Sequence, residues 1–328
     1  MKLKTLALAA VAWTAALSAP AAMAATVELS LGHTLAPDSH YQATGERMAE
    51  IAARKSNGEI KINLFPQSQL GGEVKMIQAA RSGVQDMLIT AQAPLTNTVK
   101  AYSLFDVPYL FDSVDQANKV LAGPIGQKFL DMLPRYNLVG LGFLSVMERN
   151  VFSAKPIKGS ADMNGEKLRV MQSPGYVETY RSFGALPTPM AYGDLYLSLQ
   201  QGVVDGGDTS PDQFVMDKFL EVSKYYNLTK VHYLPALLII SKAKWDKLTP
   251  EQQKILQESA TEALAYGRDY YKKSYAESIE RMKAAGVTVV DSDVSSLKKA
   301  SEPVVASLLK EIPDGEALYK EIQQAKEQ

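Results

Sequence analysis

The chain has 328 residues, of which 46% are hydrophobic and 22% are charged, and this is enough for two domains with ordinary hydrophobic cores. Its 35 basic and 36 acidic residues give a formal net charge of −1, which argues against nucleic acid or an anionic membrane as a partner. The absence of cysteine excludes disulfides, thiol nucleophiles and thiolate metal sites.

The N-terminus has the pattern of a secretory signal peptide. Lys2 and Lys4 precede an apolar run at residues 6–17, and the small-residue site Ala22-Met23-Ala24 follows. We expect cleavage before Ala25, which removes two lysines and no acidic residue, so the net charge falls from −1 to −3. No later stretch offers the ~20 continuous apolar residues of a membrane-spanning helix. We therefore expect residues 1–24 not to be part of the folded domains. The simplest interpretation is a bacterial periplasmic protein.

The first half of the chain alternates predicted strands and helices, which is typical of an α/β fold with a largely parallel sheet. The apolar segment 104–111 is interrupted by Pro108 and is expected to be a packed connector rather than a regular element. The predicted elements of this half are strands at 27–31, 59–65, 87–90 and 138–144, and helices at 41–56, 73–81 and 114–133.

A second α/β unit is predicted to begin at about residue 151, with a strand at 151–153 that crosses over from the first unit. Residues 236–241 are apolar throughout, as a buried central strand would be. The other predicted elements are a strand at 167–171, helices near 176–183 and 214–222, a further segment at 192–201 and a short strand at 203–205.

One long helix is predicted late in the chain. Thr249 to Gln252 form a capping box with proline at the first helical position, and no further proline occurs before Gly286. Apolar or small residues then recur every three or four positions, which predicts a helix at about 250–285 with a length of ~54 Å at 1.5 Å per residue. Two helices separated at Gly267 are the alternative, but we favour a single helix that lies across both units. A strand at 288–290 and helices from about 294 complete the chain.

Patterns of catalytic residues are absent from the sequence. It contains no GxSxG, HExxH, P-loop or EF-hand pattern, and Gly140-Leu141-Gly142 is better explained as small residues in a packed strand. Three scattered histidines, His33, His40 and His232, make a weak case for a metal site. We expect His33 and His232 to form hydrogen bonds at loops or strand ends, and His40 to belong to a helix cap. No metal, cofactor or catalytic residue is predicted.

Polar residues instead gather at predicted strand ends. Arg169 lies between two apolar neighbours in a strand that we expect to be buried, where its planar guanidinium needs an acceptor. The acceptor is either an internal carboxylate or the carboxylate of a ligand, and the sequence leaves both open. Arg149 lies at the entry to the second unit, Gln172 follows Arg169, and residues 205–211 form a turn. Ligands of open α/β sheets bind beyond the carboxyl ends of strands, so these groups describe a site that holds an anion without transforming it.

At these residues the sequence resembles the DctP-type solute-binding proteins of TRAP transporters. The resemblance covers essentially the whole chain after residue 24, and its motifs occur in order and at the expected spacing. They are Phe65-Pro-Gln-Ser-Gln-Leu-Gly71 with Glu73, Gly83-Val-Gln-Asp-Met87, Phe105-Asp-Val-Pro-Tyr-Leu-Phe111, Gly165-Glu-Lys-Leu-Arg169 and Gly202-Val-Val-Asp-Gly206.

The resemblance implies a role for individual residues. Arg169 resembles the family arginine that pairs with the ligand carboxylate, and Arg149 resembles a second arginine found in many members. The usual Glu-Asn-Pro after the Asp-Gly turn is replaced by Asp208-Thr209-Ser210, so Thr209 stands where a ligand-binding asparagine is common. The other residues predicted to contact or tune the ligand are Gln172, Tyr192, Glu73, Gln92, Asp208, His33 and His232.

The resemblance also implies a two-lobed periplasmic binding protein, in which each lobe is a mixed, mostly parallel sheet flanked by helices. The first lobe would comprise residues 26–146 and 236–274, and the second 147–235 and 275–328. The ligand would be a small organic acid: a dicarboxylate, a sugar acid, a keto or hydroxy acid, or an aromatic acid. The implied partners are membrane permease subunits of DctQ and DctM type, and the protein is expected to be a monomer. The alternatives are a periplasmic enzyme acting on a sugar acid, and a binding protein that serves a chemoreceptor or an ABC-type importer.

Overall fold

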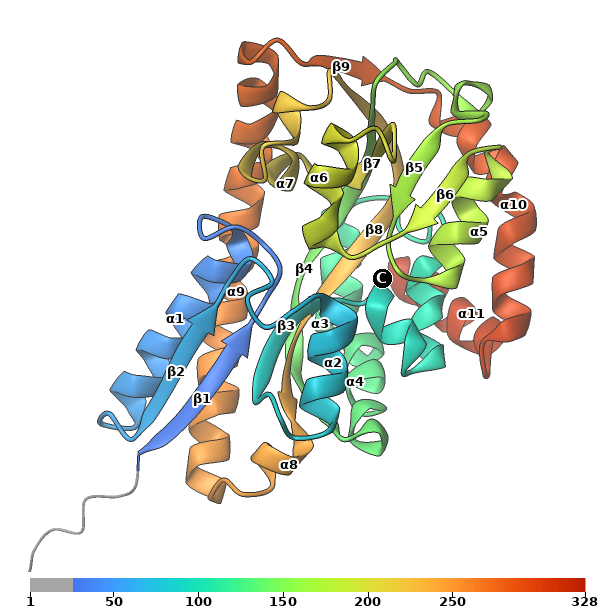
Figure 1. Ribbon diagram of the computed structural model, residues 1–328. Helices are drawn as coiled ribbons and strands as arrows, with labels where there is room; N and C mark the ends of the chain where they lie inside the picture. Colours follow the sequence, from blue (N-terminus) through green and yellow to red (C-terminus); the bar gives the residue numbers. More distant parts are fainter. Residues whose placement is uncertain (1–25, 328) are drawn as a thin grey trace, which may run out of the picture.

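A computed structural model describes residues 26–327 and contains one mixed sheet of nine strands flanked by helices (Figure 1). The predicted signal peptide lies outside the described residues. The strand order is β2-β1-β3-β8-β4-β7-β5-β6, and β9 pairs with β8. The strands are β1 (Val27–Gly32), β2 (Ile60–Phe65), β3 (Met87–Ala91), β4 (Leu138–Ser153), β5 (Lys167–Val170), β6 (Leu186–Pro189), β7 (Gly206–Thr209), β8 (Tyr225–Ser241) and β9 (Thr288–Asp291).

The two ends of this sheet are parallel and define two lobes. In the first lobe, β1 pairs in parallel with β2 and β3, and in the second lobe β5 pairs in parallel with β6 and β7. Figure 1 shows these two ends as separate bodies, joined by the antiparallel pair of β4 and β8. The predicted two-lobed α/β class is confirmed, but the two lobes share one continuous mixed sheet and do not each have a separate one.

The strands β4 and β8 are much longer than predicted, with 16 and 17 residues. The predictions of separate strands at 138–144 and 151–153, and of a strand confined to 236–241, are therefore wrong. Polar residues such as Glu148 and Asn150 interrupt the apolar run of β4, although both side chains are buried and the pairing continues past them. Irregularities in the register at three places, one of them between Arg149 and Val151, also disturb the alternation.

Helices cover both faces of the first lobe, and one prediction there is wrong. The single helix predicted at 114–133 is interrupted at Gly123, whose extended backbone separates α3 from α4, and Pro124 begins the second helix. The predicted connector is confirmed as a buried segment that contains a 3₁₀ helix at Lys100–Asp106. The α-helices of this lobe are α1 (His40–Lys55), α2 (Glu73–Arg81), α3 (Val114–Ala122), α4 (Pro124–Leu130) and the short α8 (Lys242–Trp245).

In the second lobe, the turn residues determine where elements begin. The strand predicted at 203–205 lies instead at β7, because residues 201–203 form the turn that follows α6. The helix predicted at 214–222 begins at Pro211 and ends at Met216, since proline suits the first helical turn. The helices are α5 (Pro174–Ser182), α6 (Leu195–Gln200), α7 (Pro211–Met216), α10 (Val294–Glu311) and α11 (Gly315–Lys326). The last two contact elements of both lobes, including α5, α3 and α4.

The predicted long helix is confirmed as a single helix, α9 (Pro250–Ala284), of 35 residues. Its capping box at Thr249 and Gln252 is formed as predicted. The helix continues through Gly267, where a Cβ atom would lie 2.0 Å from Oγ1 of Thr44 on α1. This glycine therefore allows close helix packing and does not break the helix. Because α9 also packs on β4 and α7, it braces both lobes along one side of the molecule (Figure 1).

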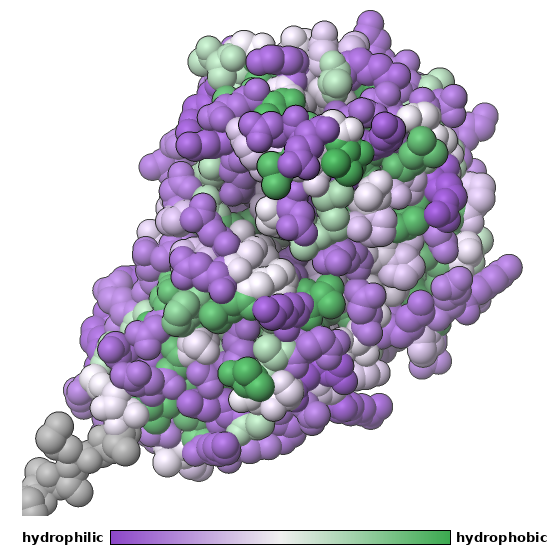
Figure 2. Space-filling model, in the orientation of Figure 1, coloured by the Kyte–Doolittle hydropathy of each residue, from purple (hydrophilic) through white to green (hydrophobic). Residues whose placement is uncertain are grey.

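Hydrophilic residues lie mainly at the surface, and hydrophobic residues form the core. The face shown in Figure 2 is mainly hydrophilic, with hydrophobic residues in small groups. Within residues 26–327, no helix is long and apolar enough to cross a membrane. One hydrophobic core cluster extends through both lobes, and a second lies beneath α3, α4, α10 and α11. The two lobes thus share a continuous hydrophobic core. Polar side chains lie where the facing edges of the two lobes meet.

Candidate ligand-binding site

The facing edges of the two lobes enclose a small internal cavity of about 10 Å³, which has room for about one water molecule. Both lobes contribute to its wall, as do the crossing strands β4 and β8. Its lining residues are Thr34, Leu35, Tyr41, Glu73, Ala91, Met147, Arg149, Met171, Tyr192, Gln213 and Leu234. Three of the residues that the sequence predicted for a ligand site line this cavity: Glu73, Arg149 and Tyr192. A fourth predicted residue, Asp208, forms an ion pair with Arg149.

Arg169, at the carboxyl end of β5, is 1% exposed. Its Nε and Nη2 atoms donate to the main-chain oxygen of Met190 at 3.1 and 2.9 Å, and its Nη1 faces the Met171 sulfur at 3.5 Å. Its guanidinium also lies 5.5 Å from the centre of the Tyr192 ring. Within residues 26–327, no carboxylate lies within 4.0 Å of this guanidinium. Burial lowers the pKa of Arg169, and the Asp208 carboxylate opposes that shift.

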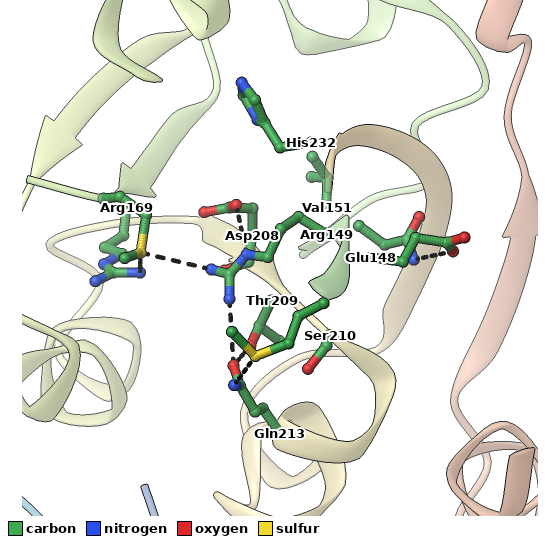
Figure 3. A network of polar contacts seen from close by, with 12 residues as sticks. Glu148, Arg149, Val151, Arg169, Asp208, Thr209, Ser210, Gln213 and His232 are labelled. Carbon is green, nitrogen blue, oxygen red and sulfur yellow. Dashed lines mark hydrogen bonds and ion pairs between the residues drawn. The ribbon is translucent and has the colours of Figure 1, made fainter. Parts of the chain in front are cut away.

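Arg149, on β4, is buried to the same degree but is already paired. Its Nε donates to Oδ2 of Asp208 at 2.9 Å, its Nη2 donates to the main-chain oxygen of Asp208, and its Nη1 donates to Oε1 of Gln213 at 3.2 Å. Burial alone would lower the pKa of Arg149, but the Asp208 carboxylate outweighs it and raises this pKa. The internal ion pair that the sequence left open for Arg169 is thus formed by Arg149 (Figure 3).

Glu73, in the first turn of α2, places a buried carboxylate on the first-lobe wall of the cavity. Its Oε1 accepts hydrogen bonds from the Ala91 main-chain nitrogen at 2.8 Å and from the Thr90 hydroxyl at 3.2 Å. Burial raises the pKa of Glu73, and these hydrogen bonds oppose the shift. Among residues 26–327, the cavity wall thus has a paired cation, Arg149, and a hydrogen-bond acceptor, Glu73, and the unpaired cation Arg169 lies behind Met171 and Tyr192.

The predicted residues Tyr192 and Thr209 are held by neighbours from the second lobe. The Tyr192 hydroxyl donates to Oδ2 of Asp217 at 2.6 Å, while its ring lines the cavity beside Arg169. Burial raises the pKa of the Asp217 carboxyl to about 7. The Thr209 hydroxyl donates to Oε1 of Gln213 at 2.7 Å, so Thr209 reaches the cavity through that glutamine.

Four further predicted residues lie apart from the cavity wall, as do Arg169, Thr209 and Asp208 described above. Gln172 is half-buried, and its main-chain oxygen accepts from Asn97 at 2.8 Å. Gln92 donates to Oδ1 of Asp106 at 3.0 Å. His33 bonds to Gln42 at 2.8 Å, and His232 bonds to the main-chain oxygen of Asp106 at 3.1 Å. Both histidines form hydrogen bonds as predicted, but His232 lies inside β8 and not at a strand end, whereas His33 follows β1; burial lowers the pKa of each to about 4. Contact of these four side chains with a ligand stays a prediction.

The cavity also contains residues that the sequence analysis missed. Met147 and Met171 each lie two positions from an arginine, and alternate residues of an extended chain share a face, so this spacing could have revealed them. Gln213 comes two residues after the turn at residues 205–211, but no pattern in the sequence singles it out. Its position depends on the start of α7 at Pro211, three residues before the predicted start at 214.

Two parallel sheet ends joined by long crossing strands, with buried arginines at the cavity between them, define a two-lobed ligand-binding protein. The family model for bacterial extracellular solute-binding proteins, family 7 (DctP), matches residues 31–311. This chain belongs to that family, whose members are periplasmic substrate-binding proteins.

Individual relatives are similar over nearly their whole length. The 2,3-diketo-L-gulonate-binding periplasmic protein of Escherichia coli is 31% identical, over 91% of this chain and 92% of the relative. A TRAP periplasmic solute-binding protein from Polaromonas, solved with D-erythronate, is 34% identical over 90% of this chain and 98% of its own, with a TM-score of 0.87. The sugar-acid-binding protein of Advenella mimigardefordensis, solved with galactonate, is 27% identical over 92% and 98%, with a TM-score of 0.90.

Proposed function

We propose that this protein captures a small hydroxylated monocarboxylic acid in the periplasm and delivers it to the membrane subunits of a TRAP transporter. Residues 1–24 would direct export and be removed. The observation that carries the proposal is the buried guanidinium of Arg169, which has no carboxylate partner among residues 26–327 and which contacts Met171 and Tyr192 of the cavity wall. A ligand carboxylate can accept two parallel hydrogen bonds from such a group, and burial strengthens this pairing.

The charges around the cavity favour one ligand carboxylate over two. Asp208 already balances the charge of Arg149, which among residues 26–327 leaves Arg169 as the one unpaired cation next to the cavity, while the Glu73 carboxylate faces the cavity. A second carboxylate of a ligand would meet Glu73 without a free cation to offset it. Hydroxyl groups, in contrast, can donate to Glu73. The relatives described above bind acids of this kind: a diketogulonate, erythronate and galactonate.

The capture mechanism follows from the two lobes. The first lobe would comprise residues 26–146 and 236–274, and the second residues 147–235 and 275–328, with the ligand bound between them. A cavity of about 10 Å³ is far smaller than a sugar acid, so ligand entry requires the lobes to separate. Ligand binding then shifts the population of open and closed forms by its differential affinity for the two. The closed, liganded form would dock on the permease.

A thermal-shift screen tests this function. The chain from residue 25 onward, unfolded and refolded once to strip any carried-over ligand, is mixed with sugar acids, hydroxy acids, C4-dicarboxylates and aromatic acids. A ligand at ~100 times its dissociation constant adds about 2.7 kcal/mol, which corresponds to a shift of several degrees. We expect such a shift with hydroxylated monocarboxylates. No shift with any acid, or a larger one with dicarboxylates, contradicts the proposal, and conversion of the bound acid to a product would indicate an enzyme instead.

A further inference from the structure

Gln213 is the one amide side chain on the cavity wall, and its orientation is determined by its neighbours. It lies near the start of α7 and is 3% exposed. Its Oε1 accepts from Nη1 of Arg149 at 3.2 Å and from the Thr209 hydroxyl at 2.7 Å (Figure 3). An arginine can only donate, so the amide oxygen must face Arg149 and the amide nitrogen must face the other way.

The amide nitrogen of Gln213 has only a weak partner among residues 26–327. Its Nε2 lies 3.1 Å from the sulfur of Met147, and a thioether is a poor hydrogen-bond acceptor. The nitrogen carries two N–H groups, and the sulfur can engage one of them. The cavity wall therefore presents an N–H donor in a fixed direction. A better acceptor has to come from a molecule in the cavity.

The Gln213 amide nitrogen is separated from the Arg169 guanidinium, which would hold the ligand carboxylate. The Met171 sulfur lies between the two arginines, at 3.5 Å from Nη1 of Arg169 and 3.9 Å from Nη2 of Arg149, and Gln213 lies on the far side of Arg149. An acid whose carboxylate pairs with Arg169 therefore reaches Gln213 with another part of its chain. A ligand oxygen at that position would accept a hydrogen bond from the Gln213 N–H group, whereas a methylene group there would leave the N–H group buried without an acceptor.

We propose that Gln213 is a specificity-determining residue, whose amide donates to a hydroxyl or keto oxygen of the bound acid beyond its carboxylate. The inference rests on the proposed function. A buried donor left without an acceptor is costly, so the site should reject an acid that lacks this oxygen by tenfold or more. The rival interpretation is that Gln213 only positions Arg149 and Thr209, in which case every acid would be affected to the same extent.

The test compares affinities for matched acids. D-erythronate and D-galactonate, each with its 2-deoxy and 3-deoxy counterparts, are titrated by calorimetry into the wild-type protein, Gln213→Met and the control Gln257→Met. The control amide lies on α9 and donates to the Leu141 main-chain oxygen at 2.8 Å. In the wild type and the control, loss of one particular hydroxyl should weaken binding about tenfold or more. In Gln213→Met the same loss should change the affinity less than about threefold.

Gln213→Glu keeps the acceptor for Arg149 and Thr209 but replaces the donor, so it tests the inference if Gln213→Met does not fold. Its affinity for 2,3-diketo-L-gulonate relative to L-gulonate should fall at least tenfold compared with the wild type, because a keto oxygen cannot donate to a carboxylate. Equal weakening of all acids, or unchanged ratios in both variants, overturns the inference while the proposed function stands. If no acid binds the wild-type protein, the proposed function fails, and the inference fails with it.

Discussion

At the scale of single residues, two arginines with nearly equal burial differ in their partners. Arg149 has an aspartate at 2.9 Å, whereas Arg169 has main-chain and sulfur acceptors only. A buried cation next to a buried carboxylate stabilises the fold mainly by avoiding an uncompensated charge. A buried cation without a carboxylate can pair with a ligand. We therefore assign Arg149 chiefly to the scaffold of the site and Arg169 to the ligand.

Arg149→Ala is expected to lower the free energy of unfolding by about 3–5 kcal/mol, because it leaves the Asp208 carboxylate buried without its cation. Urea unfolding followed by circular dichroism measures this change. Arg149→Ala/Asp208→Asn is the matched control, and it should recover part of the loss. A single variant as stable as the wild type would show that the ion pair does not support the fold.

The sequence predicted the main charged residues of the site but not their pairing. Arg149, Arg169 and Glu73 were identified by their places at the ends of elements and by family resemblance. Which arginine pairs with Asp208 depends on the register of β4 and β7, which joins Val151 to Asp208, and no local pattern encodes it. Asp106 was missed for a similar reason: it lies in an irregular connector, and its burial arises from contacts between distant segments.

At the scale of elements, β4 and β8 were predicted too short, because polar residues interrupt their apolar sequence patterns. Local periodicity predicted the short strands β1, β2, β3, β5 and β9 and the long helix α9, but β6 was not predicted and the strand expected at 203–205 lies at β7. The continuation of β4 through residues 145–150 depends on its partner β8, which supplies hydrogen bonds along its whole length. The start of α7 was missed because Pro211 was assigned to the preceding turn, although proline is equally suited to a first helical position.

Gly267→Ala should destabilise the protein by about 1–3 kcal/mol, despite the higher helix propensity of alanine, because the added methyl group overpacks the contact of α9 with α1. The Cβ atom would lie 2.0 Å from Oγ1 of Thr44 and 2.5 Å from Leu144. Thermal unfolding measures the loss, and Ala265→Gly, at an exposed position of the same helix, reports the effect of propensity alone. A Gly267→Ala variant with an equal or higher melting temperature would contradict this packing.

The buried carboxyl group of Asp106 is expected to make the stability of the fold depend on pH. Oδ1 of Asp106 accepts from Gln92 at 3.0 Å, the Ser173 hydroxyl from the second lobe donates to Oδ2, and burial raises the pKa of Asp106 to about 7. Between pH ~4 and ~7 the folded protein thus binds a proton that the unfolded chain does not, so this group's contribution to stability falls as the pH rises. Asp217, whose pKa is also raised to about 7, acts in the same direction. The lowered pKa of His33 and His232 acts in the opposite direction below pH ~6.5.

Asp106→Asn isolates the contribution of this one carboxyl. The melting temperature of the variant relative to the wild type should increase from pH 4.5 to about 7 and then level off. The other titrating groups are common to both proteins and cancel in the difference. Differential scanning calorimetry across this range is the measurement, and a difference that does not vary with pH would argue against a protonated Asp106 in the fold.

At the scale of the whole molecule, contacts between the lobes surround the cavity. His40 lies 3.1 Å from Asp212, and the Thr96 hydroxyl lies 3.1 Å from the Ser173 hydroxyl, in each case joining the first lobe to the second. In the proposed mechanism, opening breaks these contacts and closing around a ligand restores them. The balance between the open and closed forms therefore includes hydrogen bonds that the ligand never touches.

Thr96→Cys/Ser173→Cys should form a disulfide that holds the lobes together, since the two hydroxyl oxygens are already adjacent and the chain has no cysteine of its own. The oxidised, ligand-free variant is expected not to take up any acid, and reduction should restore binding to the level of the single variants. Fluorescence or calorimetric titration before and after reduction gives the comparison. Equal binding in both redox states would mean that ligand entry does not require this separation.

The measurement that most directly tests the account is a calorimetric titration of the wild-type protein and Arg169→Ala with the acid that gives the largest thermal shift. We predict binding to the wild type and no detectable binding to Arg169→Ala, whose circular dichroism spectrum should remain that of a folded protein. We expect this result because we propose that the ligand carboxylate pairs with the Arg169 guanidinium. An Arg169→Ala variant that stays folded and binds the acid within about tenfold of the wild-type affinity would contradict the central claim.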